Sequence, residues 1–188
     1  MVRKPTEGLK DKIKETIYRI YKKDGRKKVT IRGVAIKCNC SPVPVYHAFK
    51  TREDMFDFCL EQSLTNLLDL ASQEKTKSLI LDIDLALLKL VTRNTGLKEE
   101  FSIKENKINV ENKLYRITCE FLKSHGKEIT PRLESEIHGN IYFIYNFISL
   151  LHPNFLKDDI FIDFEKVFLN LHTQIEINAA NQVELYDN

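Results

Sequence analysis

Four cysteines and five histidines are the side chains of this sequence best suited to bind a metal or to perform catalysis. Cys38 and Cys40 form a Cys-x-Cys pair, but no second pair completes the spacing of a zinc site, so we interpret them as small buried thiols rather than as a metal or redox centre. The histidines lack HExxH spacing, and neither a Gly-rich phosphate loop nor a nucleophile elbow is present. We therefore predict no catalytic residue, no metal site and no cofactor, which favours a binding protein over an enzyme.

Charge is distributed unevenly along the chain, although the net charge is only +2. Residues 1–53 hold 15 Lys and Arg against 5 Asp and Glu, whereas the remaining residues hold 14 against 22. A basic first quarter indicates that this end of the protein meets a polyanion, and a solvated basic face without a partner is the alternative.

Two apolar features bear on location. The N-terminal residues contain no apolar core of a signal peptide, so we expect a cytoplasmic protein with reduced thiols. The longest apolar run, Ile137 to Leu151, is short for a membrane span and contains His138 and Asn140. We interpret this run as a buried helix and expect no membrane association.

The stretch from Thr30 to Phe49 has the pattern of two short helices joined by a tight turn. Thr30 is placed to cap the first helix, and Asn39 stands at the turn because asparagine tolerates positive φ better than most residues. Ser41 is placed to cap the second helix, whose first turn contains Pro42.

Within that second helix, Val45 and Phe49 are four residues apart and are expected to pack inward. Tyr46 and His47 then lie on the outer side. A long helix follows from Thr51, where Thr51 and Asp54 resemble a capping box.

The rest of the chain predicts helices only, and no strand-like alternation stands out. The fold class is therefore all-α. Periodicity and breaks place helices at about 7–23, 51–72, 75–94, 96–104, 108–125, 131–151 and 158–178.

The N-terminal motif resembles the DNA-binding domain of the TetR family of transcriptional regulators over about residues 9–56. The matching residues are Thr30-Ile31-Arg32, Val34-Ala35, Ser41, Val45-Tyr46, Phe49 and Arg52-Glu53-Asp54-Met55. The resemblance implies a three-helix helix-turn-helix domain at 1–50 and a helical ligand-binding and dimerisation domain at 51–188.

The resemblance also implies which residues meet DNA. The region of Thr30 and Lys50 would contact phosphates, Tyr46 and His47 the DNA backbone, and Pro42, Val43 and Pro44 the base edges or the adjoining backbone. The full predicted set is Lys28, Thr30, Arg32, Ser41, Pro42, Val43, Pro44, Tyr46, His47 and Lys50.

The motif departs from the family pattern at three positions. Asn39 replaces the usual glycine of the turn, Val43 a small residue, and Pro44 a polar residue. Two prolines and a valine offer no side-chain hydrogen bonds to bases, which leaves apolar contact with thymine methyl groups, or indirect readout.

The helix expected over 131–151 is apolar nearly all round, so it must be buried on two sides. One side can face its own core, and the other needs a partner. Together with an apolar stripe on the last helix, this predicts a four-helix interface of a homodimer, as the resemblance also implies, with a monomer as the alternative. The interface residues would be Ile137, Ile141, Ile144, Ile148, Phe161, Phe164, Phe168 and Leu171.

The body also has residues that can enclose an apolar cavity with a few polar groups, although they can equally fill a packed core. They are Leu87, Val91, Phe101, Tyr115, Cys119 and Tyr142. An apolar small molecule is the expected effector.

These features predict a dimeric, ligand-responsive transcriptional regulator, a repressor that binds a palindromic operator in double-stranded DNA. One alternative is a helical dimeric interaction protein that keeps the scaffold but has lost sequence-specific DNA reading. Another is a small-molecule carrier or an enzyme built in the helical body, and the missing catalytic groups count against the enzyme but not against the carrier.

Overall fold

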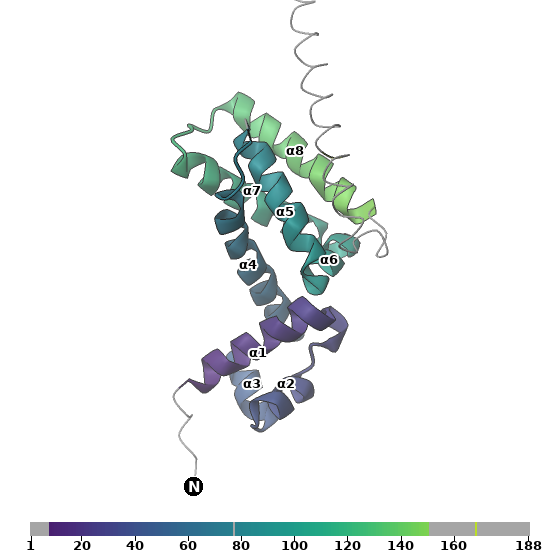
Figure 1. Cartoon of the computed structure of the whole chain (residues 1–188). Coiled ribbons are helices and arrows are strands. Elements are labelled where there is room, and N and C mark those ends of the chain that lie inside the picture. The colour runs from purple at the N-terminus through teal and green to yellow at the C-terminus, as the bar shows by residue number, and fades with distance from the viewer. Residues whose placement is uncertain (1–7, 77, 151–167, 169–188) are drawn as a thin grey trace, which may run out of the picture. The chain divides into compact units, whose positions relative to one another are not determined.

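The chain folds into helices joined by short turns, and the computed structural model describes residues 8–76, 78–150 and 168 (Figure 1). The described residues contain no β-strand, so the all-α prediction is confirmed for this part. The helices are α1 (Leu9–Asp24), η1 (Arg26–Lys28), α2 (Ile31–Cys38), α3 (Pro42–Ala48), α4 (Arg52–Ala71), α5 (Leu79–Thr92), α6 (Thr95–Ser102), η2 (Lys104–Asn106), α7 (Lys107–Ser124) and α8 (Pro131–Leu150).

These helices all lie within residues 1–150, one of two units into which the chain divides. The helix predicted over 158–178 lies outside the described residues. The predicted domain boundary at residue 50 falls between α3 and α4 and stays a prediction. No helix in the described residues has the length and apolar character that a membrane crossing requires.

Helices α2 and α3 pack against one apolar face of α1. Ile13, Ile17 and Ile20 recur at helical spacing on that face and are buried. Both α2 and α3 pack against α1 and against each other, and Val34 and Val45 are fully buried. This packing holds α2 and α3 in place with their other sides toward solvent.

Helix α4 connects this N-terminal group to the body. Its first turn is fixed by a capping box, in which the Thr51 hydroxyl accepts from the Asp54 amide and the Asp54 carboxylate accepts from the Thr51 amide. Along its length α4 packs against α1, α5 and α7. In the body, α5 is buried on nearly all sides and packs against α4, α6, α7 and α8.

The contact between α1 and α6 depends on a glycine. A Cβ on Gly96 of α6 would lie 2.6 Å from the ring carbons of Tyr21 of α1, and that ring is fully buried. Only a residue without a side chain lets α6 approach α1 this closely.

We predict that Gly96→Ala destabilises the protein by about 1–3 kcal/mol, because the new methyl group drives α6 away from Tyr21. The measurement is the free energy of unfolding from urea denaturation. Gly139→Ala is the matched control: Gly139 lies inside α8 with open space at its Cβ position, so this substitution should stabilise by about 0.5–1 kcal/mol. Equal stability of the two variants would contradict the close packing of α6 on α1.

A carboxyl group is buried between α5 and α8. Asp84 is 1% exposed, its Oδ1 accepts from Asn140 Nδ2 at 2.9 Å, and its Oδ2 has no hydrogen-bond partner among the described residues. Burial raises the pKa of Asp84 to about 8, because the charged form loses its hydration, and the Asn140 hydrogen bond offsets only part of this rise.

We predict that Asp84→Asn stabilises the protein increasingly as the pH rises. The folded state keeps the Asp84 proton up to about pH 8, whereas the unfolded chain releases it near its ordinary pKa of 3.8. Between these values the folded state binds more protons, so the wild type loses about 1.4 kcal/mol per pH unit that the asparagine variant does not lose. Urea denaturation at pH 5 and pH 8 measures this difference, and an identical gain at both pH values would contradict it.

Candidate nucleic-acid interface

The turn between α2 and α3 is built from local backbone chemistry. The Thr30 hydroxyl accepts from the Gly33 amide at 3.1 Å and so caps α2. Asn39 ends α2 in the left-handed region, with φ 55° and ψ 48°. The Cys40 amide then donates to the Ala35 carbonyl at 3.0 Å. Asparagine therefore supplies at this turn the positive φ for which glycine is the commonest residue.

Helix α3 presents one side to the core and the other to solvent. Val45 and Phe49 are buried, and the Phe49 ring lies against that of Phe58 in α4, with centroids 5.4 Å apart. Tyr46 and His47 are exposed on the opposite side, as the spacing predicts. The inner contacts thus fix the direction in which the outer side chains point.

Ser41 occupies the N-cap position of α3, but its hydroxyl makes no capping hydrogen bond. An N-cap hydroxyl normally accepts from the amide of the second or third helical residue. The third residue is Pro44, which has no amide hydrogen. The predicted N-cap position of Ser41 is therefore confirmed, but the expected capping hydrogen bond is absent: Pro44 cannot donate one, the Val43 amide does not, and no cap contact occupies the exposed hydroxyl.

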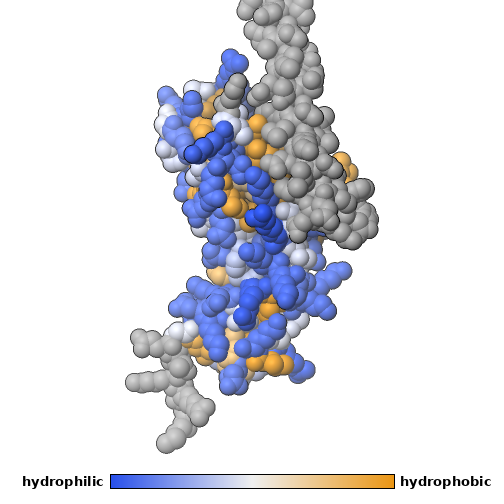
Figure 2. Space-filling view, in the orientation of Figure 1, coloured by the Kyte–Doolittle hydropathy of each residue, from blue (hydrophilic) through white to orange (hydrophobic). Residues whose placement is uncertain are grey.

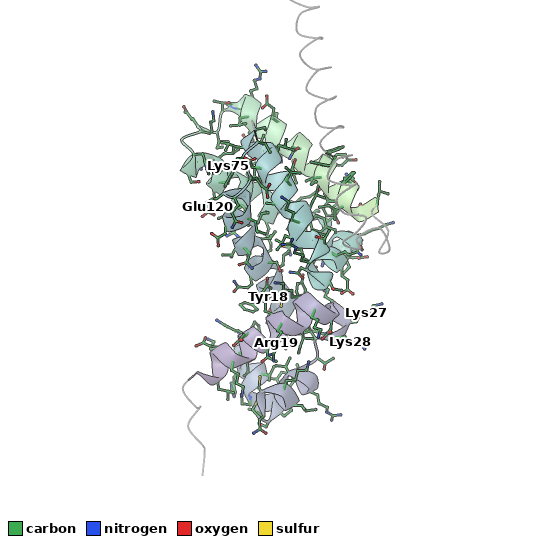
Figure 3. All side chains as sticks on the ribbon, in the orientation of Figure 1. Tyr18, Arg19, Lys27, Lys28, Lys75 and Glu120 are labelled. Carbon is green, nitrogen blue, oxygen red and sulfur yellow. The ribbon has the colours of Figure 1, made fainter. Side chains whose placement is uncertain are left out.

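The predicted DNA-contacting residues lie on the α2–α3 region and on the loops beside it. All of them are exposed except Pro44, which is half-buried. Lys28 follows α1, Arg32 lies in the first turn of α2, and Lys50 follows α3. Figure 3 shows Lys27 and Lys28 pointing outward from the turn after α1.

Arg26 and Arg52 organise the basic loop after α1 through contacts that the sequence analysis did not predict. The Arg52 side chain donates through Nε to the Val29 carbonyl at 3.1 Å and through Nη2 to the Arg26 carbonyl at 3.3 Å. The guanidinium groups of Arg26 and Arg52 both lie over the ring of Phe56, at 4.0 and 5.3 Å from its centroid. The first turn of α4 thereby holds the loop that carries Lys27 and Lys28.

The buried Glu100 carboxylate on α6 binds Arg26 from the side of the body. Glu100 accepts from the Tyr21 hydroxyl at 3.2 Å, from Arg26 Nη1 at 2.8 Å and from the Asn106 side-chain amide. Burial raises the pKa of Glu100, and these three donors oppose that rise. Glu99 accepts from the Arg26 backbone amide at 2.6 Å. The N-terminal helices and the body are therefore joined by directed polar bonds as well as by packing.

The predicted ligand-binding residues have different surroundings in the described part of the chain, and their role stays a prediction. Leu87, Val91 and Phe101 are packed in the core, whereas Tyr142 is 61% exposed with the Lys107 ammonium 4.8 Å from its ring centroid. Tyr115 and Cys119 line a cavity of about 480 Å³ beside α7. The other residues that line this cavity are Arg116, Glu120, Lys123 and Ile129.

The Tyr115 side chain is held in place from α8. Its hydroxyl donates to Glu134 Oε1 at 2.9 Å, and its ring stacks on His138 with centroids 4.5 Å apart. Hydrogen bonding to Cys119 and Glu134 raises the pKa of Tyr115. A second cavity, of about 440 Å³, lies where the start of α4 meets the end of α6, and Arg26, Arg52, Phe56 and Ile103 are among its lining residues.

The apolar residues predicted for a dimer interface divide into two groups. Ile137, Ile141, Ile144 and Ile148 are buried on the side of α8 that packs within the unit, and Tyr142 and Leu150 are exposed instead. Phe168 is buried, while Phe161, Phe164 and Leu171 lie outside the described residues.

The cysteines occupy ordinary helical positions. Cys38, Cys59 and Cys119 are buried, Cys40 is half-buried, and all four are free thiols. Burial raises the pKa of Cys40 and that of Cys59. Within residues 8–76 and 78–150, no three His, Cys, Asp or Glu side chains are grouped so that they could hold a metal ion.

Comparison by sequence gives no relative: no protein-family model and no curated protein matches the chain. Comparison of structures does give relatives. A TetR-family transcriptional regulator from Streptomyces coelicolor is 15% identical with a TM-score of 0.64, over 94% of this chain and 84% of that protein. RolR, solved without ligand, is 14% identical with a TM-score of 0.54, over 82% of this chain and 87% of RolR.

These similarities span both the α1–α3 region and most of the helical body. At such low identity they establish the arrangement of the helices and not the chemistry of individual side chains. The fold resemblance inferred from the motif at residues 9–56 thus extends to the larger part of the chain, and this chain has the fold of TetR-family transcriptional regulators.

Proposed function

We propose that this protein is a transcriptional regulator that binds duplex DNA, with α3 in the major groove. The observation that carries the proposal is the two-sided α3: Val45 and Phe49 are buried, while Tyr46 and His47 face solvent beside exposed basic residues. A helix held in this way can enter a groove about 12 Å wide without unfolding anything around it. The fold shared with two solved regulators supports the same role.

The phosphates are contacted by the residues around α2 and α3. Lys28, Arg32 and Lys50 supply positive charge, and the Thr30 and Ser41 hydroxyls supply donors. Tyr46 and His47 contact the backbone at the end of α3. Phosphate contacts of this kind position the protein and supply most of its affinity, and they carry no sequence information.

The regulator acts as a homodimer on a palindromic operator. Two copies related by a twofold axis place their α3 helices in successive major grooves, one helical turn of DNA or a multiple apart. The exposed side of α8, with Tyr142 and Leu150, is the described surface that fits such a contact, because the isoleucines of the same helix face inward.

An apolar small molecule that binds the body releases the operator, so the protein acts as a repressor. The cavity beside Tyr115 and Cys119 is a candidate entry to the body. A ligand changes the DNA affinity only if it binds one arrangement of the helices more tightly than the other. The path to the DNA-binding helices is the contact of α6 with α1, through Glu100 and Arg26.

The alternative function is that of a helical dimeric interaction protein without sequence-specific DNA reading. Pro42, Val43 and Pro44 favour it, because their side chains offer no hydrogen bonds to bases. The test of the proposed function separates the two.

We expect purified protein to select a palindromic site from a pool of random duplex DNA, and the preference to survive near-physiological salt. Specific contacts persist when counterion release no longer favours binding, whereas purely electrostatic binding does not. Tyr46→Ala and His47→Ala should each weaken binding to every sequence, because backbone contacts are lost. Equal binding to all sequences that disappears with salt would favour the interaction protein.

Charge variants sharpen the same experiment. The affinity falls as the salt concentration rises, and Lys50→Ala should make this fall less steep. The slope of log affinity against log salt should become less negative by about 1 per subunit, because one phosphate contact is lost. Lys127→Ala removes the same charge from the exposed loop between α7 and α8 and is the matched control. An identical slope change in both variants would mean that only net charge matters.

We expect light scattering at micromolar concentration to give about twice the 22.0 kDa mass of the chain. Leu150→Glu on the exposed side of α8 should shift the protein toward the monomer, because it would bury a charge in the contact. Arg132→Glu changes another exposed position of the same helix and should leave the mass unchanged. A 22.0 kDa particle for the wild type would contradict the dimer.

A further inference from the structure

The N-terminal turn of α3 lacks nearly all of its polar groups. Pro42, Val43 and Pro44 have neither donors nor acceptors in their side chains. Two of these three residues also lack an amide hydrogen, so Val43 alone among them can donate from the backbone. This turn has almost nothing with which to hydrogen-bond a base edge.

The same region exposes large apolar side chains. Val43 is 58% exposed, Tyr46 is 55% exposed and lies one turn further along α3, and Ile36 at the end of α2 is 72% exposed. Apolar surface is visible over α2 and α3 at the lower end of Figure 2. Because Val45 and Phe49 hold the inner side of α3, Val43 is fixed in this outward position.

The major groove of unmodified DNA offers one apolar group for such a surface, the 5-methyl group of thymine. We propose that Val43, with Pro42 beside it, reads thymine methyl groups in the operator, so that the first turn of α3 recognises bases by apolar contact. This inference rests on the proposed DNA-binding function and names the chemistry of its base recognition.

The charge around the patch favours DNA over an apolar protein surface as its occupant. Lys28, Arg32 and Lys50 are exposed around α2 and α3, and residues 1–53 hold 15 Lys and Arg against 5 Asp and Glu. A polyanion with apolar groups in its groove matches this combination, whereas an apolar protein partner would leave the cations unpaired.

The test replaces thymines of the selected operator, one symmetric pair at a time, with deoxyuridine. Uracil keeps every hydrogen-bonding group of thymine and lacks only the methyl group. Loss of one buried methyl group weakens binding about fourfold, and loss of the same methyl in both half-sites about fifteenfold. We expect this loss at the thymines beneath the first turn of α3 and no loss at distant thymines, measured by fluorescence anisotropy at fixed salt.

Variants assign the effect to Val43. In Val43→Ala the thymine operator should bind more weakly and the uracil substitution should have little further effect, because the contacting group is gone. Tyr46→Phe removes only a hydroxyl group, so it should weaken binding to both operators equally and preserve the uracil effect. Val43 is exposed, and circular dichroism and urea denaturation check that both variants remain folded.

Each outcome has a defined meaning. A selected operator that tolerates every uracil substitution overturns the methyl reading and leaves the regulator function standing. A uracil effect that persists in full in Val43→Ala overturns the assignment to Val43. Failure to select any operator overturns the proposed function and this inference together.

Discussion

The joint between α1 and α6 is the contact on which the rest of the described structure depends. The buried Glu100 carboxylate accepts from Tyr21 and Arg26, which lie close together at the end of α1 and in η1, and from Asn106 in η2. A buried carboxylate without such partners would be strongly unfavourable, so each of the three donors offsets part of the cost of burying Glu100. Gly96 lets the Tyr21 ring come close enough for this arrangement. Packing and polar bonding therefore reinforce each other at the same place.

This joint also determines how firmly the basic loop is held. Arg26 bonds Glu100 through its side chain and Glu99 through its backbone amide, while Arg52 binds the carbonyls of Val29 and Arg26. A shift of α6 would thus move the residues next to Lys27 and Lys28. The proposed ligand response would act through this joint, because packed interfaces with directed bonds change between discrete arrangements more readily than they deform gradually.

The sequence predicted the features that depend on neighbouring residues and missed those that join distant ones. Thr30 and Asn39 predict the two ends of α2, because capping and positive φ depend on neighbouring residues. The Tyr21–Glu100 hydrogen bond joins residues 79 positions apart, so no local pattern predicts it. Pro44 removes one of the two amides that the Ser41 hydroxyl could have accepted from, and this loss could have been read from the sequence. In α8 the apolar pattern runs all round, so periodicity alone left open that Ile137 faces inward and Tyr142 outward.

The chemistry of α3 limits how this protein can be specific. A bidentate hydrogen-bonded contact discriminates by about 1–3 kcal/mol, whereas a methyl contact contributes about 0.8 kcal/mol. Under the proposed thymine contact, Val43 and its proline neighbours would therefore discriminate less per base than polar residues would. If the protein reads DNA as proposed, its specificity must accumulate from several thymines, from duplication of each contact in the second half-site of a dimer, and from the shape of DNA rich in A·T pairs. For weak methyl contacts of this kind, the fixed position of α3 on Val45 and Phe49 would be more important than for strong hydrogen bonds, because a weak contact is lost if the helix moves.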